Sequence, residues 1–269
     1  MQRCFLRPIF VSWNTAILAL LFLLSGPTYA GISGIWLFDE DRGDEVLDLS
    51  GNDNHGTING GVEWKPDGKF GGALLFNGSD GWVEIPNSAS LIPPEITIVA
   101  WIYLDNVIGN HAIAEKYDWQ AGKGSFVLRT GPVLGAGAGN DLSFMFIVGT
   151  TDPPPLATAQ GILVDTEWIH VAGTIDGSLV KLFVNGEEAA VTEFDSEMLP
   201  SDTSLSLGSR GDTKDIHWHA GLMDEVAILD EALPETEIKK IMQSGLQSYM
   251  AVHPKSKLSV AWGAVKSGF

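Results

Sequence analysis

Cysteine is almost absent from this sequence. Of the 269 residues only Cys4 is a cysteine, and it lies in an N-terminal segment that we expect to be removed. A chain without cysteine has no disulfide framework, so a packed core or a bound metal must stabilise it. The residues after position 30 suffice for one large β domain, because such domains often run to roughly 200–250 residues.

The sequence also has no hydrophobic run long enough to span a bilayer. The apolar run at residues 16–24 is well short of the ~20 residues that a spanning helix needs. It follows Arg3 and Arg7 and precedes a small-residue TYA sequence ending at residue 30, the layout of a secretory signal peptide. We therefore predict a signal peptide over residues 1–30, a secreted, periplasmic or extracellular protein, and no membrane insertion after cleavage. The alternative is an uncleaved membrane anchor.

Basic residues are scarce as well. The chain has 16 Lys and Arg against 34 Asp and Glu, a formal net charge of −18. Such a charge repels nucleic acid and anionic membranes, which excludes both as principal partners. Acidic loops do favour divalent cations, but charge alone does not define a site.

What the sequence does contain is a series of short strand patterns. Gly, Asn, Asp and Pro clusters separate them, and regular spacing of this kind predicts an all-β antiparallel sandwich of two sheets. Residues 96–104 carry apolar side chains on both faces, which predicts a central strand with both faces covered. The expected strands are residues 32–38, 72–76, 82–85, 96–104, 112–117, 125–130, 142–148, 168–175, 179–184, 189–192, 204–207 and 221–229.

One helix is expected, over residues 234–245. Pro234 opens it, Glu235 and Glu237 follow, lysines come later and Gly245 closes it. This order suits the helix dipole and the preference for proline at the start and glycine at the end. The sequence thus predicts a β-sandwich with one short C-terminal helix.

Five segments together resemble a known family. They are GIWLFDE with DLSGNDNHG before residue 57, KFGGALLFNGSDGWVEIP at 69–86, ITIVAWIYL at 96–104, WIHVAGTIDGSLVKLFVNG at 168–186, and LSLGSRGD with HAGLMDEVAILDEALPETEI at 205–238. In this order they resemble the laminin-G-like jellyroll domains of the concanavalin A-like lectin/glucanase superfamily. The resemblance implies a two-sheet jelly roll over residues 31–246 and an extracellular binding module; the tail, residues 247–269, has no assigned role.

The DLSGNDNHG loop is a candidate cation site. It lacks the glycine and the glutamate that an EF-hand loop requires at fixed positions. The family resemblance implies instead a structural cation that joins this loop to the last long strand. The matching residues are Asp48, Asn52, Asn54 and Asp224, and their carboxylate and amide oxygens are ligands that Ca²⁺ accepts. The alternative is a polar turn held by its own backbone.

Catalysis is not expected. The superfamily that the sequence resembles includes glycoside hydrolases, which place paired carboxylates on one strand. No E-x-D-x-x-E pattern occurs on an expected strand, and neither G-x-S-x-G nor H-E-x-x-H is present. We predict a binding protein rather than an enzyme.

Aromatic and polar residues with an outward position are candidates for ligand binding. A glycan site needs aromatic planes beside hydrogen-bonding groups, although aromatic residues more often fill cores. The same surface could bind an extracellular protein instead of a glycan. The candidates are Trp101, Tyr103, Tyr117, Trp119, Arg129, His170 and Trp218. Carbohydrate binding or adhesion with a structural Ca²⁺ is the favoured function; protein–protein adhesion, and less so glycoside hydrolysis, are the alternatives.

Overall fold

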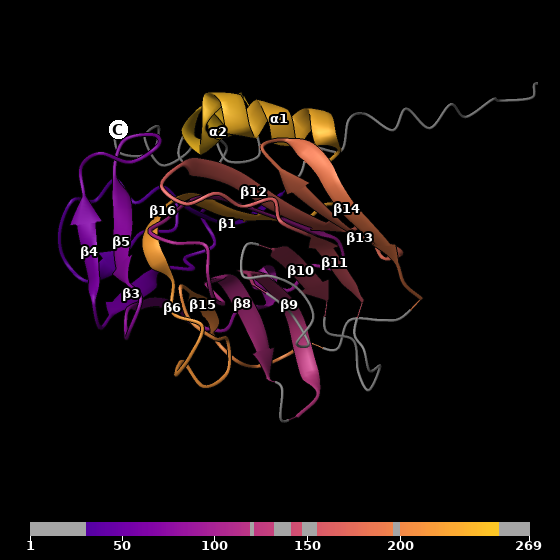
Figure 1. The fold of residues 1–269 in the computed structure, drawn as a ribbon, viewed down its shortest axis with the longest axis horizontal. Coiled ribbons are helices and arrows are strands. Elements are labelled where there is room, and N and C mark those ends of the chain that lie inside the picture. The colour runs from indigo at the N-terminus through magenta and orange to yellow at the C-terminus, as the bar shows by residue number, and fades with distance from the viewer. Residues whose placement is uncertain (1–30, 119–120, 132–140, 147–154, 196–199, 253–269) are drawn as a thin grey trace, which may run out of the picture.

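The computed structural model describes residues 31–118, 121–131, 141–146, 155–195 and 200–252. Two antiparallel sheets of eight strands each face one another (Figure 1). The predicted signal peptide and Trp119 lie outside the described residues, as does most of the predicted tail. The described part of the chain holds no helix that is long and apolar enough to cross a membrane.

The first sheet, called sheet A here, contains the meander and the central strand that the sequence predicts. Its strands follow the order β14-β13-β12-β7-β16-β5-β4, and β1 pairs with β16. The central strand is β7, which pairs with β12 on one side and β16 on the other. The bounds are β1 Ile32–Trp36, β4 Val62–Lys65, β5 Ala73–Asn77, β7 Ile96–Leu104, β12 Trp168–Ile175, β13 Leu179–Val184, β14 Glu187–Glu193 and β16 Ala220–Leu229.

The second sheet, sheet B, has the order β11-β10-β9-β8-β15-β6-β3-β2. Several of its strands are short and carry little alternation, and β2, β3 and β11 are not among the strands expected from sequence. The bounds are β2 Glu45–Val46, β3 Gly56–Asn59, β6 Trp82–Ile85, β8 Ala112–Asp118, β9 Lys123–Thr130, β10 Leu142–Phe146, β11 Leu156–Ala159 and β15 Leu205–Leu207. A short 3-10 turn, Ala89–Leu91, follows β6.

The core lies between the two sheets because each strand turns alternate side chains inward. Ile98 and Ile102 of β7 meet Phe126 and Leu128 of β9 in one buried cluster. Each such side chain contributes about 1.5–3 kcal/mol by leaving water. The opposite side chains of these strands therefore form the outer faces of the sandwich.

Two helices cover part of the outer face of sheet A (Figure 1). Helix α1, Glu235–Ser244, is the predicted helix, and Gly245 ends it with a positive φ of 76°. Its Ile238 and Ile241 pack with Val99 and Phe183 of the sheet. A second helix, α2, Leu246–Val252, follows at once and adds residues of the predicted tail to the domain.

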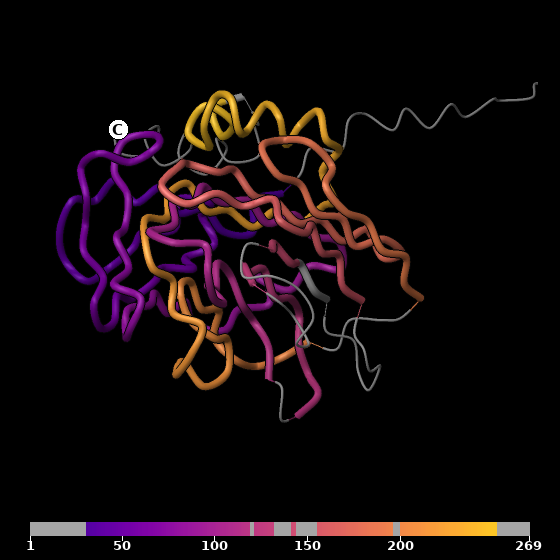
Figure 2. Tube along the Cα trace, viewed as in Figure 1, coloured from indigo at the N-terminus to yellow at the C-terminus, as the bar shows by residue number. Residues whose placement is uncertain are grey.

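The chain path places one loop over sheet B. Residues 209–218 lie in the connection between β15 and β16 and form the orange loop at the lower left of Figure 2, beside the strand labelled β8 in Figure 1. We call this segment the 209–218 loop.

Candidate functional site

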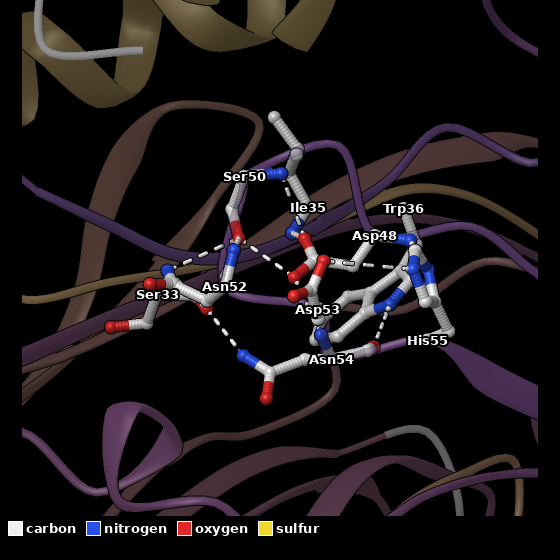
Figure 3. A network of polar contacts seen from close by, with 9 residues as sticks. All are labelled: Ser33, Ile35, Trp36, Asp48, Ser50, Asn52, Asp53, Asn54 and His55. Carbon is white, nitrogen blue, oxygen red and sulfur yellow. Dashed lines mark hydrogen bonds and ion pairs between the residues drawn. The ribbon is translucent and has the colours of Figure 1, made fainter. Parts of the chain in front are cut away.

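The DLSGNDNHG loop closes on its own polar groups (Figure 3). One Asp48 carboxylate oxygen accepts the amides of Ile35 and Ser50 at 3.0 and 2.8 Å. The other accepts the Ser50 hydroxyl at 2.7 Å and the Asn54 amide at 2.9 Å. A carboxylate offers about four lone-pair positions, so these contacts occupy the acceptor capacity of Asp48.

The other loop residues attach the loop to strand β1. The Asn54 side-chain amide donates to the Ser33 carbonyl at 2.7 Å, and the Trp36 indole donates to the Asn54 carbonyl at 2.9 Å. The Asn52 amide donates to the carbonyl oxygens of Ile32 and Ser33. This is the arrangement of the polar-turn alternative.

Asp224 takes part in a different network. One of its oxygens accepts the amides of Lys69 and Phe70 at 2.8 and 2.9 Å, and the other has no hydrogen-bond partner among the described residues. Burial raises the pKa of Asp224 to about 7, the two amides lower it, and the charge of Asp39 raises it further.

The four proposed calcium ligands are therefore divided between two networks. Asp48, Asn52 and Asn54 bind strand β1, whereas Asp224 accepts the amides of Lys69 and Phe70. The described residues hold no group of three or more His, Cys, Asp or Glu side chains suited to a metal. As arranged, Asp48 does not fit the role of a calcium ligand, so we expect no effect of calcium through this loop; a calcium ion elsewhere in the protein stays a prediction.

Asp224 and Glu225 do not point to opposite faces, as strict alternation would require. A β-bulge interrupts the pairing of β16 with β7 between Asp224 and Ala227, and Glu225 has a positive φ of 52°. Glu225 accepts the Leu246 amide at the start of α2, so both carboxylates serve the outer side of sheet A. Bulges of this kind re-aim side chains, and the sequence pattern gave no sign of this one.

Three predicted ligand-binding residues gather on the outer face of sheet A. Trp101 and His170 are cross-strand neighbours with ring centroids 5.2 Å apart, and both are buried. Lys69 lies over the Trp101 ring at 4.2 Å from its centroid. Only Tyr103, stacked edge-on against Trp168 at 5.8 Å, is partly exposed, so most of this group is closed to a ligand.

Two further predicted residues lie on the outer face of sheet B. Arg129 of β9 is beside Glu115 of β8, with 3.9 Å between the Arg129 Nη1 and Glu115 Oε1 atoms. Tyr117 lies on β8, two residues after Glu115, and hydrogen-bonds Arg210. Glu115 was not predicted as a site residue, although its place beside outward-facing Arg129 was open to the same reasoning.

The 209–218 loop covers this pair. The Gly211 amide donates to the Glu115 Oε2 atom at 3.0 Å, and Arg129 Nη1 is 3.0 Å from His217 Nδ1. Burial raises the pKa of Glu115 to about 7, against the charge of Arg129 and the Gly211 amide. Burial, together with Arg129, lowers the pKa of His217 to about 4.

Two indoles complete this face. Trp218, at the end of the loop, lies against Trp82 of β6 with 5.9 Å between ring centroids. Both are partly exposed, and Trp82 shares its side of β6 with Glu84, because Val83 and Ile85 point into the core. The structure thus brings Tyr117, Arg129 and Trp218 to one face, and we take this face as the candidate functional site.

Comparison with known proteins agrees with this architecture. With its two antiparallel sheets packed face to face, this chain is a β-sandwich of the jelly-roll class. The chain belongs to the Laminin_G_3 family, described as the Concanavalin A-like lectin/glucanases superfamily, whose model matches residues 77–239, more than half of the chain. Among curated proteins, none matches this sequence.

Solved structures share the fold at low sequence identity. Domain 4 of AbnA, an extracellular GH43 arabinanase from Geobacillus stearothermophilus, solved with arabinotriose, superposes with a TM-score of 0.60 and 19% identity, covering 80% of this chain and 99% of that one. The binding domain of Botulinum Neurotoxin DC in complex with SialylT gives a TM-score of 0.59 and 13% identity over 80% of this chain. The binding domain of Paraclostridial Mosquitocidal Protein 1 gives 0.58 and 14%, also over 80%. This chain spans about half the length of the latter two, 51% and 52%.

Proposed function

We propose that this protein is an exported, non-catalytic carbohydrate-binding module whose glycan lies on the outer face of sheet B. One observation carries the proposal: a pair of partly exposed indoles, Trp82 and Trp218, lies on the same face as buried charged groups that are incompletely hydrogen-bonded. Aromatic planes beside a few polar groups are the usual composition of such sites.

The structural neighbours support binding rather than catalysis. The AbnA domain was solved with arabinotriose and the Botulinum Neurotoxin DC domain with SialylT. Both share the fold of this chain, and the arabinanase is extracellular by its description. Since a fold hosts many functions, these neighbours indicate a class of ligand, a glycan, and no particular sugar.

The carboxylates of this face are engaged by groups of the protein itself. Glu115 accepts the Gly211 amide, Glu84 accepts the Ser204 hydroxyl, and Asp212 binds the Arg210 guanidinium. A glycosidase presents two carboxylates to the scissile bond as acid and as base or nucleophile. Carboxylates engaged in this way support a module that binds and does not cleave.

Protein adhesion is the second candidate function. The partly exposed Tyr103 and Trp168 on sheet A favour it, because aromatic residues are enriched at protein interfaces. The two candidates use opposite faces of the sandwich, which makes them separable by mutation.

A glycan array probed with the purified protein tests the proposal. Trp218→Ala should weaken binding to the array glycans by about tenfold or more, since covering a large apolar side chain contributes roughly 1.5–3 kcal/mol. Trp168→Ala is the matched control, because Trp168 is an equally half-buried indole packed on an aromatic neighbour of the other face. Binding lost only in the Trp168 variant would move the site to sheet A, and an array without any bound glycan would favour adhesion.

A further inference from the structure

On the outer face of sheet B, two adjacent charged side chains each leave one polar atom without a hydrogen-bond partner in the described part of the chain. Glu115 Oε1 and Arg129 Nε are both buried and have no hydrogen-bond partner among the described residues. Glu115 itself is completely buried. Buried polar groups are satisfied in the great majority of cases, so two orphans in adjacent side chains point to a missing partner.

The chemistry of the two orphans specifies that partner. An ionised Glu115 Oε1 accepts a hydrogen bond from a hydroxyl group, and Arg129 Nε donates one to an oxygen. Because the two side chains lie side by side, 3.9 Å apart at Nη1 and Oε1, they suit two neighbouring hydroxyl groups of one sugar ring.

The charges of this face favour an uncharged ligand. Three cations lie around Glu115: Arg129, Arg210 and Lys214. Three carboxylates, those of Glu115, Glu84 and Asp212, act electrostatically on these cations or bind them. The cations therefore have no excess over the carboxylates, and the chain as a whole carries −18. An acidic glycan would meet no net attraction here and a repulsive field around the protein.

The 209–218 loop stands between the pair and solvent. It is attached to the sheet by polar contacts such as those of Gly211 and His217, while its one large aliphatic side chain, Ile216, is 41% exposed. A segment with few buried apolar contacts opens at low free-energy cost. Ligand access therefore requires this loop to release Glu115 and Arg129.

We propose that Glu115 and Arg129 form the hydroxyl-recognition pair of the site and that the ligand is a neutral glycan with adjacent hydroxyls. It binds as the part of the 209–218 loop that carries Gly211 moves away, while Trp218 stays against Trp82. This inference rests on the proposed function and adds to it the ligand class and the residues that select it.

Calorimetric titration tests the pair with three neutral probes, arabinotriose, laminaritriose and mannotriose, and one acidic probe, trigalacturonate. Glu115→Gln keeps an acceptor for the Gly211 amide but removes the free carboxylate oxygen. It should therefore weaken the binding of whichever neutral probe the wild type binds by about tenfold. Glu84→Gln is the matched control on the same face, and its affinity should stay within about twofold, because the Glu84 oxygen that bonds Ser204 is retained as an amide oxygen.

Hydrogen exchange separates recognition from a purely structural role. Because the Gly211 amide bonds Glu115, loop release on binding should speed the exchange of that amide in the wild type. Unchanged affinity in Glu115→Gln, equal binding of trigalacturonate, or slower Gly211 exchange in the complex would each overturn the inference while leaving glycan binding intact. A wild type that binds none of the glycans here or on the array overturns the proposed function and this inference together.

Discussion

Replacing Asp48 by alanine removes the centre of the network that closes the DLSGNDNHG loop. The carboxylate accepts four hydrogen bonds, and those from the amides of Ile35 and Asn54 are buried. A buried donor left without a partner costs about 1–3 kcal/mol. Two such amides, with the loss of the Ser50 contacts, should lower the free energy of unfolding by about 3–5 kcal/mol.

Thermal unfolding measures this loss. In a domain of this size 1 kcal/mol corresponds to roughly 2–4 °C, so Asp48→Ala should melt about 10 °C below the wild type. Asp48→Asn keeps one acceptor oxygen, so its melting temperature should lie between those of Asp48→Ala and the wild type. Asp53→Asn is the control, because Asp53 is exposed and asparagine tolerates its positive φ of 57°; its melting temperature should match that of the wild type.

Repeating the melts with EGTA decides the role of calcium at this loop. Because protein donors occupy the acceptor positions of Asp48, we expect the wild-type curves with and without chelator to coincide. A wild-type melting temperature that falls by several degrees in EGTA, with Asp48→Ala indifferent to it, would establish the calcium site instead. An Asp48→Ala protein as stable as the wild type would refute the hydrogen-bond reasoning altogether.

Four further predictions concern pH, chemistry and export. Burial raises the pKa of Glu115 to about 7, so its contribution to stability is complete below about pH 4.5 and is lost as the pH rises through 7. The free energy of unfolding of Glu115→Gln, measured by chemical denaturation, should therefore rise by about 3 kcal/mol relative to that of the wild type over this pH range. A difference between the two proteins that stays constant with pH would contradict the raised pKa. Burial lowers the pKa of His170 to about 3, so His170→Gln should lose less stability than the wild type as pH falls below about 6.5, and parallel acid-unfolding curves would count against this. Purified protein should release no reducing ends from laminarin or agarose, and turnover abolished by one acidic-residue substitution would show an enzyme. Mass spectrometry of the exported protein should find Gly31 at the N-terminus, and an intact residue 1–30 segment would show that no cleavage occurs.

The fold was predictable wherever side chains repeat with a clear period. The double-sided apolar run at 96–104 identified the central strand, and the residues flanking 235–244 identified the first helix. Strands β2, β3, β4 and β11 were missed because they are two to four residues long and have too few side chains to show alternation. Helix α2 was missed because it is seven residues long, so its apolar pattern covers only about two turns.

The site was predictable only where it follows from local alternation. Outward-facing Arg129 was identified in that way, and Trp218 by its residue type. The burial of Glu115 was not, because the loop that covers it comes 96 residues later in the chain. Asp48 and Asp224 lie in separate networks, because each carboxylate accepts amide donors close to it in the fold. A β-bulge altered the direction of Glu225.

A crystal structure of the protein with the tightest-binding array glycan would locate the ligand. We expect the glycan on the outer face of sheet B, against Trp218 and within hydrogen-bond distance of Glu115 and Arg129. A glycan bound instead beside Tyr103 and Trp168 on sheet A would contradict this expectation.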